Sequence, residues 1–84
     1  MVTFYDEFGT QFHGPYGVGT LLGDQVTSFP TEEDARRAAM QLCNANDYVT
    51  TVYGPPTSIK GQGRYVKARI VTSYKWDGVC PKET

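Results

Sequence analysis

The most regular pattern of hydrophobic positions lies in the middle of the chain. Small and apolar residues recur there at the spacing that puts side chains on one face of a helix, namely Ala35, Ala38, Ala39, Leu42 and Cys43. Thr31 precedes three acidic residues, which suits a helix start because an oxygen can cap the free amides and the helix dipole favours negative charge. The pattern predicts a helix over residues 32–45, packed on one face of a sheet.

A second pattern, alternation between polar and apolar residues, runs from Arg64 to Tyr74 and predicts one continuous strand. Its first face would carry Val66, Ala68, Ile70 and Thr72. Its second face would carry Tyr65, Lys67, Arg69, Val71, Ser73 and Lys75. Strand-forming residues at 48–53, stopped by a glycine and two prolines, predict the strand before it.

The first third of the chain predicts short strands separated by turns. β-Branched and aromatic residues flank Asp6–Gly9, and we expect a hairpin there. The glycines between Gly14 and Gly19 predict a loop or a strongly bent edge. Residues 20–29 fit either one bulged strand or two short strands that turn at Gly23–Asp24.

The order of these elements, β-β-β-α-β-β, predicts a small α+β fold with a mostly antiparallel sheet and one helix on one face. A length of 84 residues predicts a single domain over residues 1–84. Residues 76–84 are predicted to form an irregular tail that lies back on the body through Trp76 and Val79. The sheet face opposite the helix would stay partly exposed, and such faces commonly bind partners.

Charge is distributed unevenly along the chain, although the net charge is only −1. Residues 1–59 carry two basic and seven acidic side chains, whereas residues 60–84 carry six basic and two acidic ones. The two parts therefore differ in sign, at −5 and +4. The basic part also contains three of the aromatic residues, Tyr65, Tyr74 and Trp76.

The strongest candidate surface is therefore the basic, aromatic strand. Side chains on one face of a strand repeat every ~6.6 Å, so Tyr65, Lys67, Arg69 and Lys75 would form one row. Arg64 and Lys60 would extend its charge. Tyr16 and Tyr53 are further candidates for partner contacts, because tyrosine is enriched at protein interfaces. The competing interpretation of the basic row is an ordinary solvated strand face balanced by acids on neighbouring strands.

The sequence offers little for catalysis, metal binding or cofactor binding. His13 is the only histidine, and Cys43 and Cys80 lack the close spacing of a zinc or redox motif. No phosphate loop or nucleophile motif is present. We therefore expect no enzyme activity, no metal, no cofactor and two unlinked thiols. The absence of a leader-like start and of a long apolar run predicts a cytoplasmic protein without membrane contact.

These observations favour a non-enzymatic binding protein that modulates or inhibits a protein partner through the exposed sheet face and the glycine-rich loops. In size and in its lack of catalytic motifs, the chain resembles the small inhibitors, such as anti-CRISPR proteins, that phages and mobile elements encode against a host enzyme or defence complex. The alternative is a nucleic-acid-binding domain that uses the basic, aromatic strand at 60–76. A monomer and a homodimer are both compatible with the sequence.

Overall fold

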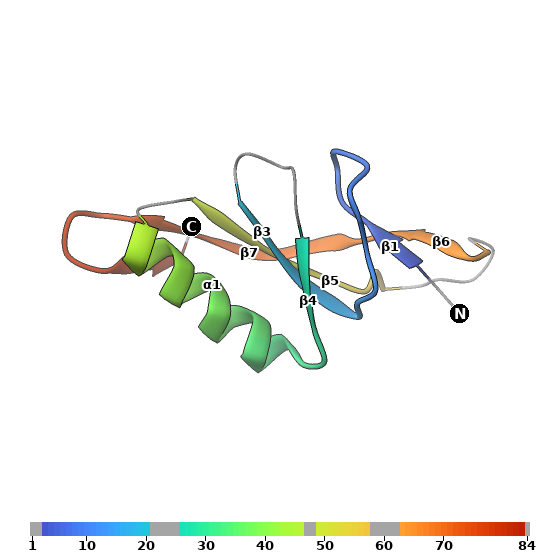
Figure 1. The fold of residues 1–84 in the computed structure, drawn as a ribbon, viewed down its shortest axis with the longest axis horizontal. Helices are drawn as coiled ribbons and strands as arrows, with labels where there is room; N and C mark the ends of the chain where they lie inside the picture. The colour runs from blue at the N-terminus through green and yellow to red at the C-terminus, as the bar shows by residue number, and fades with distance from the viewer. Residues whose placement is uncertain (1–2, 21–25, 47–48, 58–62, 84) are drawn as a thin grey trace.

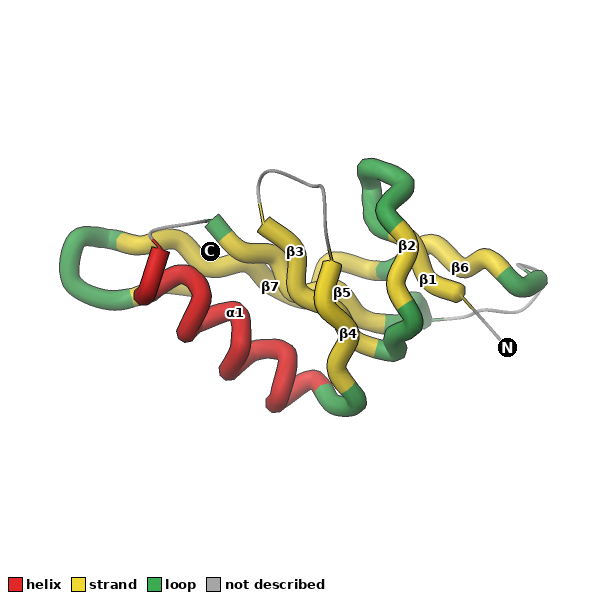
Figure 2. Tube along the Cα trace, in the orientation of Figure 1, coloured by secondary structure: helices red, strands yellow, loops and turns green. Residues whose placement is uncertain are grey.

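The computed structural model describes residues 3–20, 26–46, 49–57 and 63–83 (Figure 1). This part of the chain has an α+β fold, as predicted, with one helix and eight strands in two sheets (Figure 2). The elements are β1 (Thr3–Tyr5), β2 (Gln11–Phe12), β3 (Tyr16–Thr20), β4 (Val26–Phe29), α1 (Glu32–Asn46), β5 (Thr50–Gly54), β6 (Tyr65–Lys67), β7 (Arg69–Trp76) and β8 (Pro81–Glu83). The molecule is elongated and measures 43 × 22 × 18 Å.

The predicted helix is confirmed and begins at Glu32. The Thr31 hydroxyl accepts a hydrogen bond of 3.2 Å from the backbone amide of Asp34 and so caps the first turn. Ala35, Ala39 and Cys43 are fully buried, and they pack against residues of β3, β5 and β7. The small side chains thus let α1 lie close to one face of the larger sheet, as the sequence predicted.

The larger sheet has the strand order β4-β3-β5-β7-β8, and all of its pairs are antiparallel. The prediction of a loop over Gly14–Gly19 is wrong, because most of this segment belongs to β3, inside the sheet. The physical reason lies at Gly17, where an added Cβ would come within 2.7 Å of Val26 and 2.9 Å of Phe12. Glycine is needed here for close approach of the two sheets, and the strand continues through it.

The smaller sheet has the order β2-β1-β6. Its β1–β2 pair is the predicted hairpin, and β1 runs parallel to β6. Phe4, Phe12 and Val66 of this sheet form a second core with Tyr53 of β5. Because Val52 packs toward α1, its neighbour Tyr53 points to the opposite face of the larger sheet. The smaller sheet therefore covers one end of the face that was expected to be open.

The single strand predicted from Arg64 to Tyr74 is wrong. The chain changes sheets at Ala68, whose amide donates to the Tyr5 carbonyl at 2.8 Å, so β6 and β7 belong to different sheets. A register shift in the β5–β7 pairing then places Tyr53 opposite Ile70 and Val52 opposite Thr72. Ile70 and Thr72 consequently face opposite sides, which breaks the predicted alternation.

Residues 20–29 were predicted to form either one bulged strand or two short strands, and they fall partly outside the described residues, which include neither Gly23 nor Asp24. Of this segment, the structure describes Thr20 at the end of β3 and residues 26–29 as β4, and these two strands are paired antiparallel. The predicted irregular tail is wrong, because residues 81–83 form β8 on the edge beside β7. Trp76 packs against the core as expected, whereas Val79 is 81% exposed.

A polar network fastens α1 to this edge strand. The Arg36 guanidinium lies 3.0 Å from a Glu32 oxygen and 3.2 Å from Oε1 of Glu83. The Thr72 hydroxyl donates to the same Glu83 oxygen at 2.7 Å. The hydrogen bond from Thr72 is the largest cause that lowers the pKa of Glu83 below its ordinary value, and the bond from Arg36 is the second largest. A short edge strand thereby gains side-chain contacts with both the sheet and the helix.

This network predicts loss of stability in acid. A carboxylate whose folded pKa is lowered stabilises the fold above its unfolded pKa of about 4.3, and this contribution is lost as the pH falls through the lower folded pKa. We expect Glu83→Gln to be less stable than the wild type at neutral pH and to approach it in strong acid. Urea denaturation of both proteins across that range measures the difference. A difference that stays constant with pH would contradict the role given to Glu83.

Candidate functional site

The structure separates the residues predicted to form one basic, aromatic row. Tyr65 and Lys67 lie on β6 in the smaller sheet, whereas Arg69 and Lys75 lie on β7 in the larger one. Lys75 pairs with Lys82 of β8, at the end of β7 that leads away from β6 (Figure 1). Arg64 immediately precedes β6, and Lys60 lies outside the described residues. The predicted row is therefore not a single surface.

The two other tyrosines predicted to contact a partner lie in or against the core. Tyr53 is only 2% exposed, and its hydroxyl donates a 3.0 Å hydrogen bond to Oε1 of Glu7. Burial is the main cause that raises the pKa of Tyr53, and the bond to Glu7 adds to it. Tyr16 is half-buried and packs against the helix-side core. Tyr53 thus joins the two sheets, and its ring has no surface to offer a partner.

The outer side of the smaller sheet carries Tyr65 and Lys67 together with residues that the sequence analysis did not select. We call this surface the small-sheet face; it consists of Thr3, Tyr5, Gln11, Tyr65 and Lys67. The register places Tyr5 between Gln11 and Lys67, and Thr3 beside Tyr65. Tyr65 is 52% exposed, Tyr5 is half-buried, and both Gln11 and Lys67 are exposed. Alternate residues of the same strands point inward to the core.

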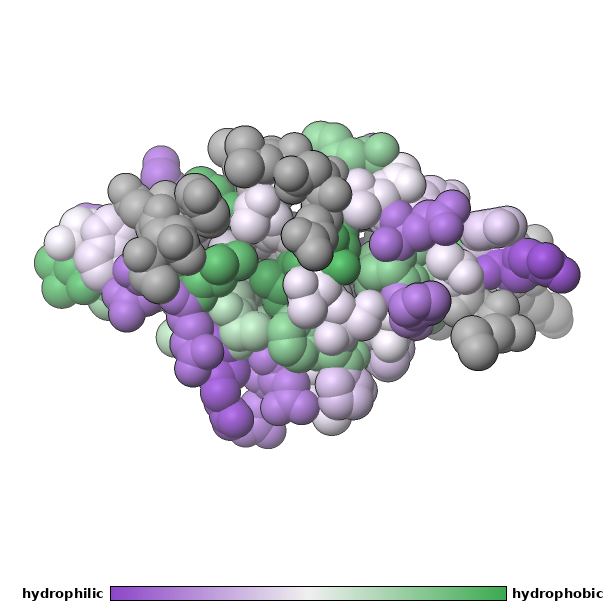
Figure 3. Space-filling model, viewed as in Figure 1, coloured by the Kyte–Doolittle hydropathy of each residue, from purple (hydrophilic) through white to green (hydrophobic). Residues whose placement is uncertain are grey.

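Positive charge gathers around this face. Arg64 and Arg69 are exposed, and within the described ranges neither makes an ion pair. Arg69 Nε donates to the Pro55 carbonyl at 3.4 Å, which leaves its charge uncompensated. Hydrophilic residues follow the helix and gather again at the end of the molecule that contains β6 (Figure 3).

The second notable surface is the turn between β1 and β2. We call it the hairpin tip; it consists of residues 6–10. Asp6 is only 2% exposed, and its Oδ1 accepts hydrogen bonds from the amides of Phe8 at 2.9 Å and Thr10 at 2.7 Å. Backbone bonds join Asp6 to Thr10 and to Gly9, which adopts a φ of +84° that glycine tolerates best. A buried carboxylate therefore fixes the backbone of the whole turn.

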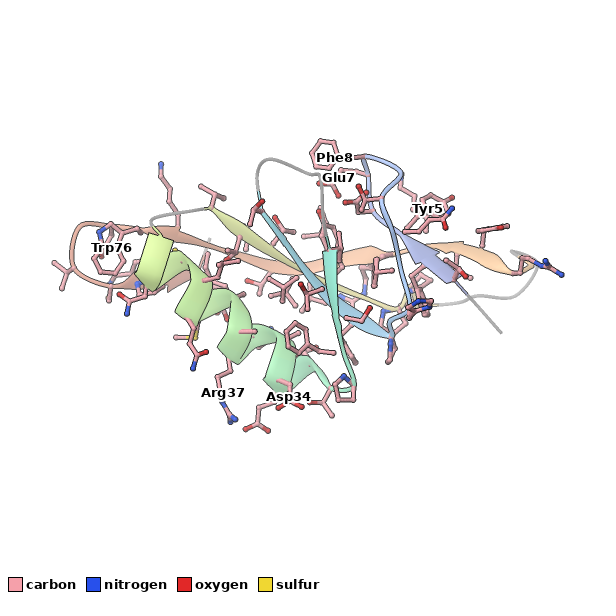
Figure 4. The ribbon with its side chains drawn as sticks, viewed as in Figure 1. Tyr5, Glu7, Phe8, Asp34, Arg37 and Trp76 are labelled. Carbon is pink, nitrogen blue, oxygen red and sulfur yellow. The ribbon has the colours of Figure 1, made fainter. Side chains whose placement is uncertain are left out.

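A phenylalanine side chain, that of Phe8, is exposed to solvent at the hairpin tip. Phe8 is 59% exposed, although its own backbone amide is fixed by Asp6. Figure 4 shows Phe8 beside Glu7 at the tip, while Tyr5 lies farther along β1. Glu7 in turn accepts the bond from Tyr53 and so ties the tip to the larger sheet. A large apolar side chain on a rigid, exposed turn is typical of an interface anchor.

Neither Phe8 nor Tyr5 was among the site residues predicted from the sequence. The sequence predicts a turn at Asp6–Gly9, but the aromatic residue inside that turn, Phe8, was not considered as a possible contact for a partner. Tyr5 could have been found by extending the alternation around Phe4, because the neighbours of an inward-facing strand residue face outward. For Phe8, only the exposure of the side chain in the structure identifies it as a candidate.

Other chemistry is limited in the part of the chain that the structure describes. No three His, Cys, Asp or Glu side chains there lie close enough to hold a metal ion. The amide of His13 donates to the Ser28 hydroxyl at 3.0 Å. Cys43 is buried, Cys80 is exposed, and neither is in a disulfide. Among the described residues, no helix is long and apolar enough to cross a membrane.

Comparison with protein-family models, with curated proteins and with solved structures finds no match to this chain.

Proposed function

We propose that this chain is a non-enzymatic binding domain that modulates or inhibits a protein partner and uses the hairpin tip as its anchor. The observation that carries this proposal is the fixed and exposed position of Phe8. Burial of a phenylalanine side chain in a partner is worth about 1.5–3 kcal/mol. Since Asp6 already holds the backbone of the tip, binding would spend little of that energy on ordering the turn.

The charge beside Phe8 favours a protein over a nucleic acid at this position. Glu7 is the immediate neighbour of Phe8, and its side chain is exposed. A carboxylate repels phosphate groups, whereas a protein pocket can present an amide or a basic side chain to it. The anchor therefore fits an apolar pocket with a hydrogen-bond donor or a cation at its rim.

A modulating or inhibitory role fits a small chain with one fixed anchor. A domain of 84 residues can cover a functional surface of a larger protein without supplying chemistry of its own. The described residues present no metal cluster, and the exposed groups identified above are suited to contact. This is the manner of action expected of inhibitors that phages and mobile elements encode, and it is the class that we propose.

The class of partner is tested by a pull-down from cell lysate with tagged protein, divided into nuclease-treated and untreated halves. We expect a protein to be recovered in stoichiometric amount from both halves, because an apolar anchor needs no nucleic acid. Mass spectrometry identifies the protein and its amount. Recovery that collapses in the nuclease-treated half would contradict the proposal, as would a turnover activity that one polar substitution abolishes.

A further inference from the structure

A cavity of about 320 Å³ lies where an edge strand of one sheet runs beside an edge strand of the other. These strands are β2 of the smaller sheet and β4 of the larger one (Figure 2). The cavity is lined by Thr3, Gln11, Phe12, His13, Val26 and Ser28. Its volume is at the lower end of the range for ligand sites, so it suits a short chain segment better than a large cofactor.

The backbone groups of Gln11 point toward this cavity from the free edge of β2. Opposite residues of an antiparallel pair alternate between those that exchange backbone bonds and those that do not. The Asp6 amide donates to the Thr10 carbonyl at 3.0 Å, which makes that pair a bonded one. The next pair, Tyr5 opposite Gln11, therefore directs its backbone groups outward. The His13 amide, two residues farther along β2, has the same direction and reaches β4.

The Ser28 hydroxyl of β4 is available in the cavity as a hydrogen-bond donor. Its Oγ accepts bonds from the amides of His13 at 3.0 Å and Gly14 at 3.3 Å. A hydroxyl has two acceptor lone pairs and one proton, so these two bonds leave the proton for another acceptor. Within the described ranges, no residue accepts that proton or bonds to the outward groups of Gln11. The cavity thus presents one donor from β4 and a donor with an acceptor from β2.

The lining of the cavity is uncharged, which indicates the chemistry of its occupant. None of the lining residues is Lys, Arg, Asp or Glu, and His13 is the only titratable side chain among them. A charged group that enters would lose hydration without gaining a partner of opposite charge. A peptide backbone is neutral and carries the complementary N–H and C=O groups. The cavity therefore favours an extended peptide segment over a phosphate.

We propose that an extended, uncharged segment of the protein partner binds along the free edge of β2. One residue of the segment bonds to the N–H and C=O of Gln11, and a carbonyl oxygen of the segment accepts the Ser28 proton. Gln11 follows Phe8 by three residues on the same hairpin, so one partner can contact the anchor and the edge together. This inference rests on the proposed function and names the part of the partner that the chain recognises.

Gln11→Pro tests the backbone bond, because proline removes the outward amide and leaves the bonds between β1 and β2 in place. Gln11→Ala is the matched control, since it shortens the same side chain but keeps the amide. The probe is the partner purified from nuclease-treated lysate, and its affinity is measured by calorimetric titration. We expect Gln11→Pro to weaken binding about five- to tenfold and Gln11→Ala to stay within about twofold of the wild type. Wild-type affinity of Gln11→Pro would overturn this inference and leave the protein-binding proposal standing.

Amide hydrogen exchange of the wild type tests the same bond without a substitution. The partner should slow exchange of the Gln11 amide about tenfold or more, whereas the Phe12 amide, which faces β1, should change little. Unchanged exchange at Gln11 in the complex would overturn the inference. So would a wild-type dimer that Gln11→Pro dissociates, because a second copy would then occupy the edge. Failure of the wild type to recover any protein would instead overturn the proposed function, and this inference with it.

Discussion

Tyr53→Ala is expected to lower the free energy of unfolding by about 3 to 5 kcal/mol, the range found for removal of a buried aromatic ring. Tyr53 is the buried residue that β5 of the larger sheet places in the second core, where its ring lies 6.1 Å from that of Phe12. Its loss would leave Phe4 and Val66 without their partner in β5. Since a domain of this size has a total stability of about 4 to 13 kcal/mol, the loss would be at least about a quarter of the total and would unfold the protein at the lower end of that range.

Two matched variants show whether this effect belongs to the ring and to its position. Tyr53→Phe keeps the ring but removes the hydroxyl and its bond to Glu7, and should cost about 1 kcal/mol. Tyr65→Ala removes an exposed ring and should stay within about 0.5 kcal/mol of the wild type. Urea denaturation followed by circular dichroism measures all three. A cost below about 1 kcal/mol for Tyr53→Ala would mean that Tyr53 does not join the two sheets.

Asp6→Ala is expected to cost about 2 to 3 kcal/mol, because hydrogen bonds to charged groups are the stronger ones and two partly buried amides would lose their acceptor. Asp6→Asn keeps an oxygen acceptor and should retain most of the stability. The comparison is again made by urea denaturation. Equal losses in the two variants would show that the carboxylate acts in some way other than accepting these bonds.

Asp77 provides a natural control for Asp6. Its Oδ1 also accepts two backbone hydrogen bonds, from the amides of Val79 and Cys80 at 2.8 Å, but its turn is exposed. Both bonds lower the pKa of Asp77, and the bond from the Cys80 amide is the larger cause. Asp77→Ala should cost clearly less than Asp6→Ala, because water can replace the lost acceptor. An equal cost at both turns would contradict the importance given to burial of Asp6.

The helix could be predicted from sequence because its determinants are local. The spacing of Ala35, Ala39 and Cys43 and the cap at Thr31 all lie within one short segment, and each was found as expected. The hairpin at Asp6–Gly9 was predictable for the same reason. Local signals of this kind also gave the α+β class and the position of the helix on one sheet face.

The second sheet could not be predicted, because its formation depends on contacts between distant residues. In the sequence, Gly17 and its neighbouring glycines indicate the end of a strand. Only the close packing of Phe12 and Val26 against Gly17 explains why a glycine lies inside a strand here. The alternation from Arg64 to Tyr74 likewise gives no sign of the crossing at Ala68, which is set by pairing with β1. Because the chain crosses between the sheets at Ala68, the residues of the predicted site lie on two sheets.

The candidate site was predicted in part. Tyr65 and Lys67 do share an exposed face, and Arg64 directly precedes their strand, whereas Arg69 begins β7 in the other sheet. Tyr5 was missed because it joins that face through a parallel pairing between the two ends of the chain. Phe8 was missed because a turn residue is ordinarily read for its backbone conformation, whereas here its side chain is the exposed feature.

The central claim is that Phe8 is the anchor for a protein partner, and it is tested most directly by recovery of that partner with Phe8→Ala in nuclease-treated lysate. Met40→Ala is the matched control, because Met40 is an exposed apolar residue on α1, 42% exposed. We predict that Phe8→Ala loses about tenfold or more of the recovered protein, as for an interface hot spot, while Met40→Ala recovers the wild-type amount. Wild-type recovery with Phe8→Ala, or absence of any protein recovered by the wild type, would contradict the claim.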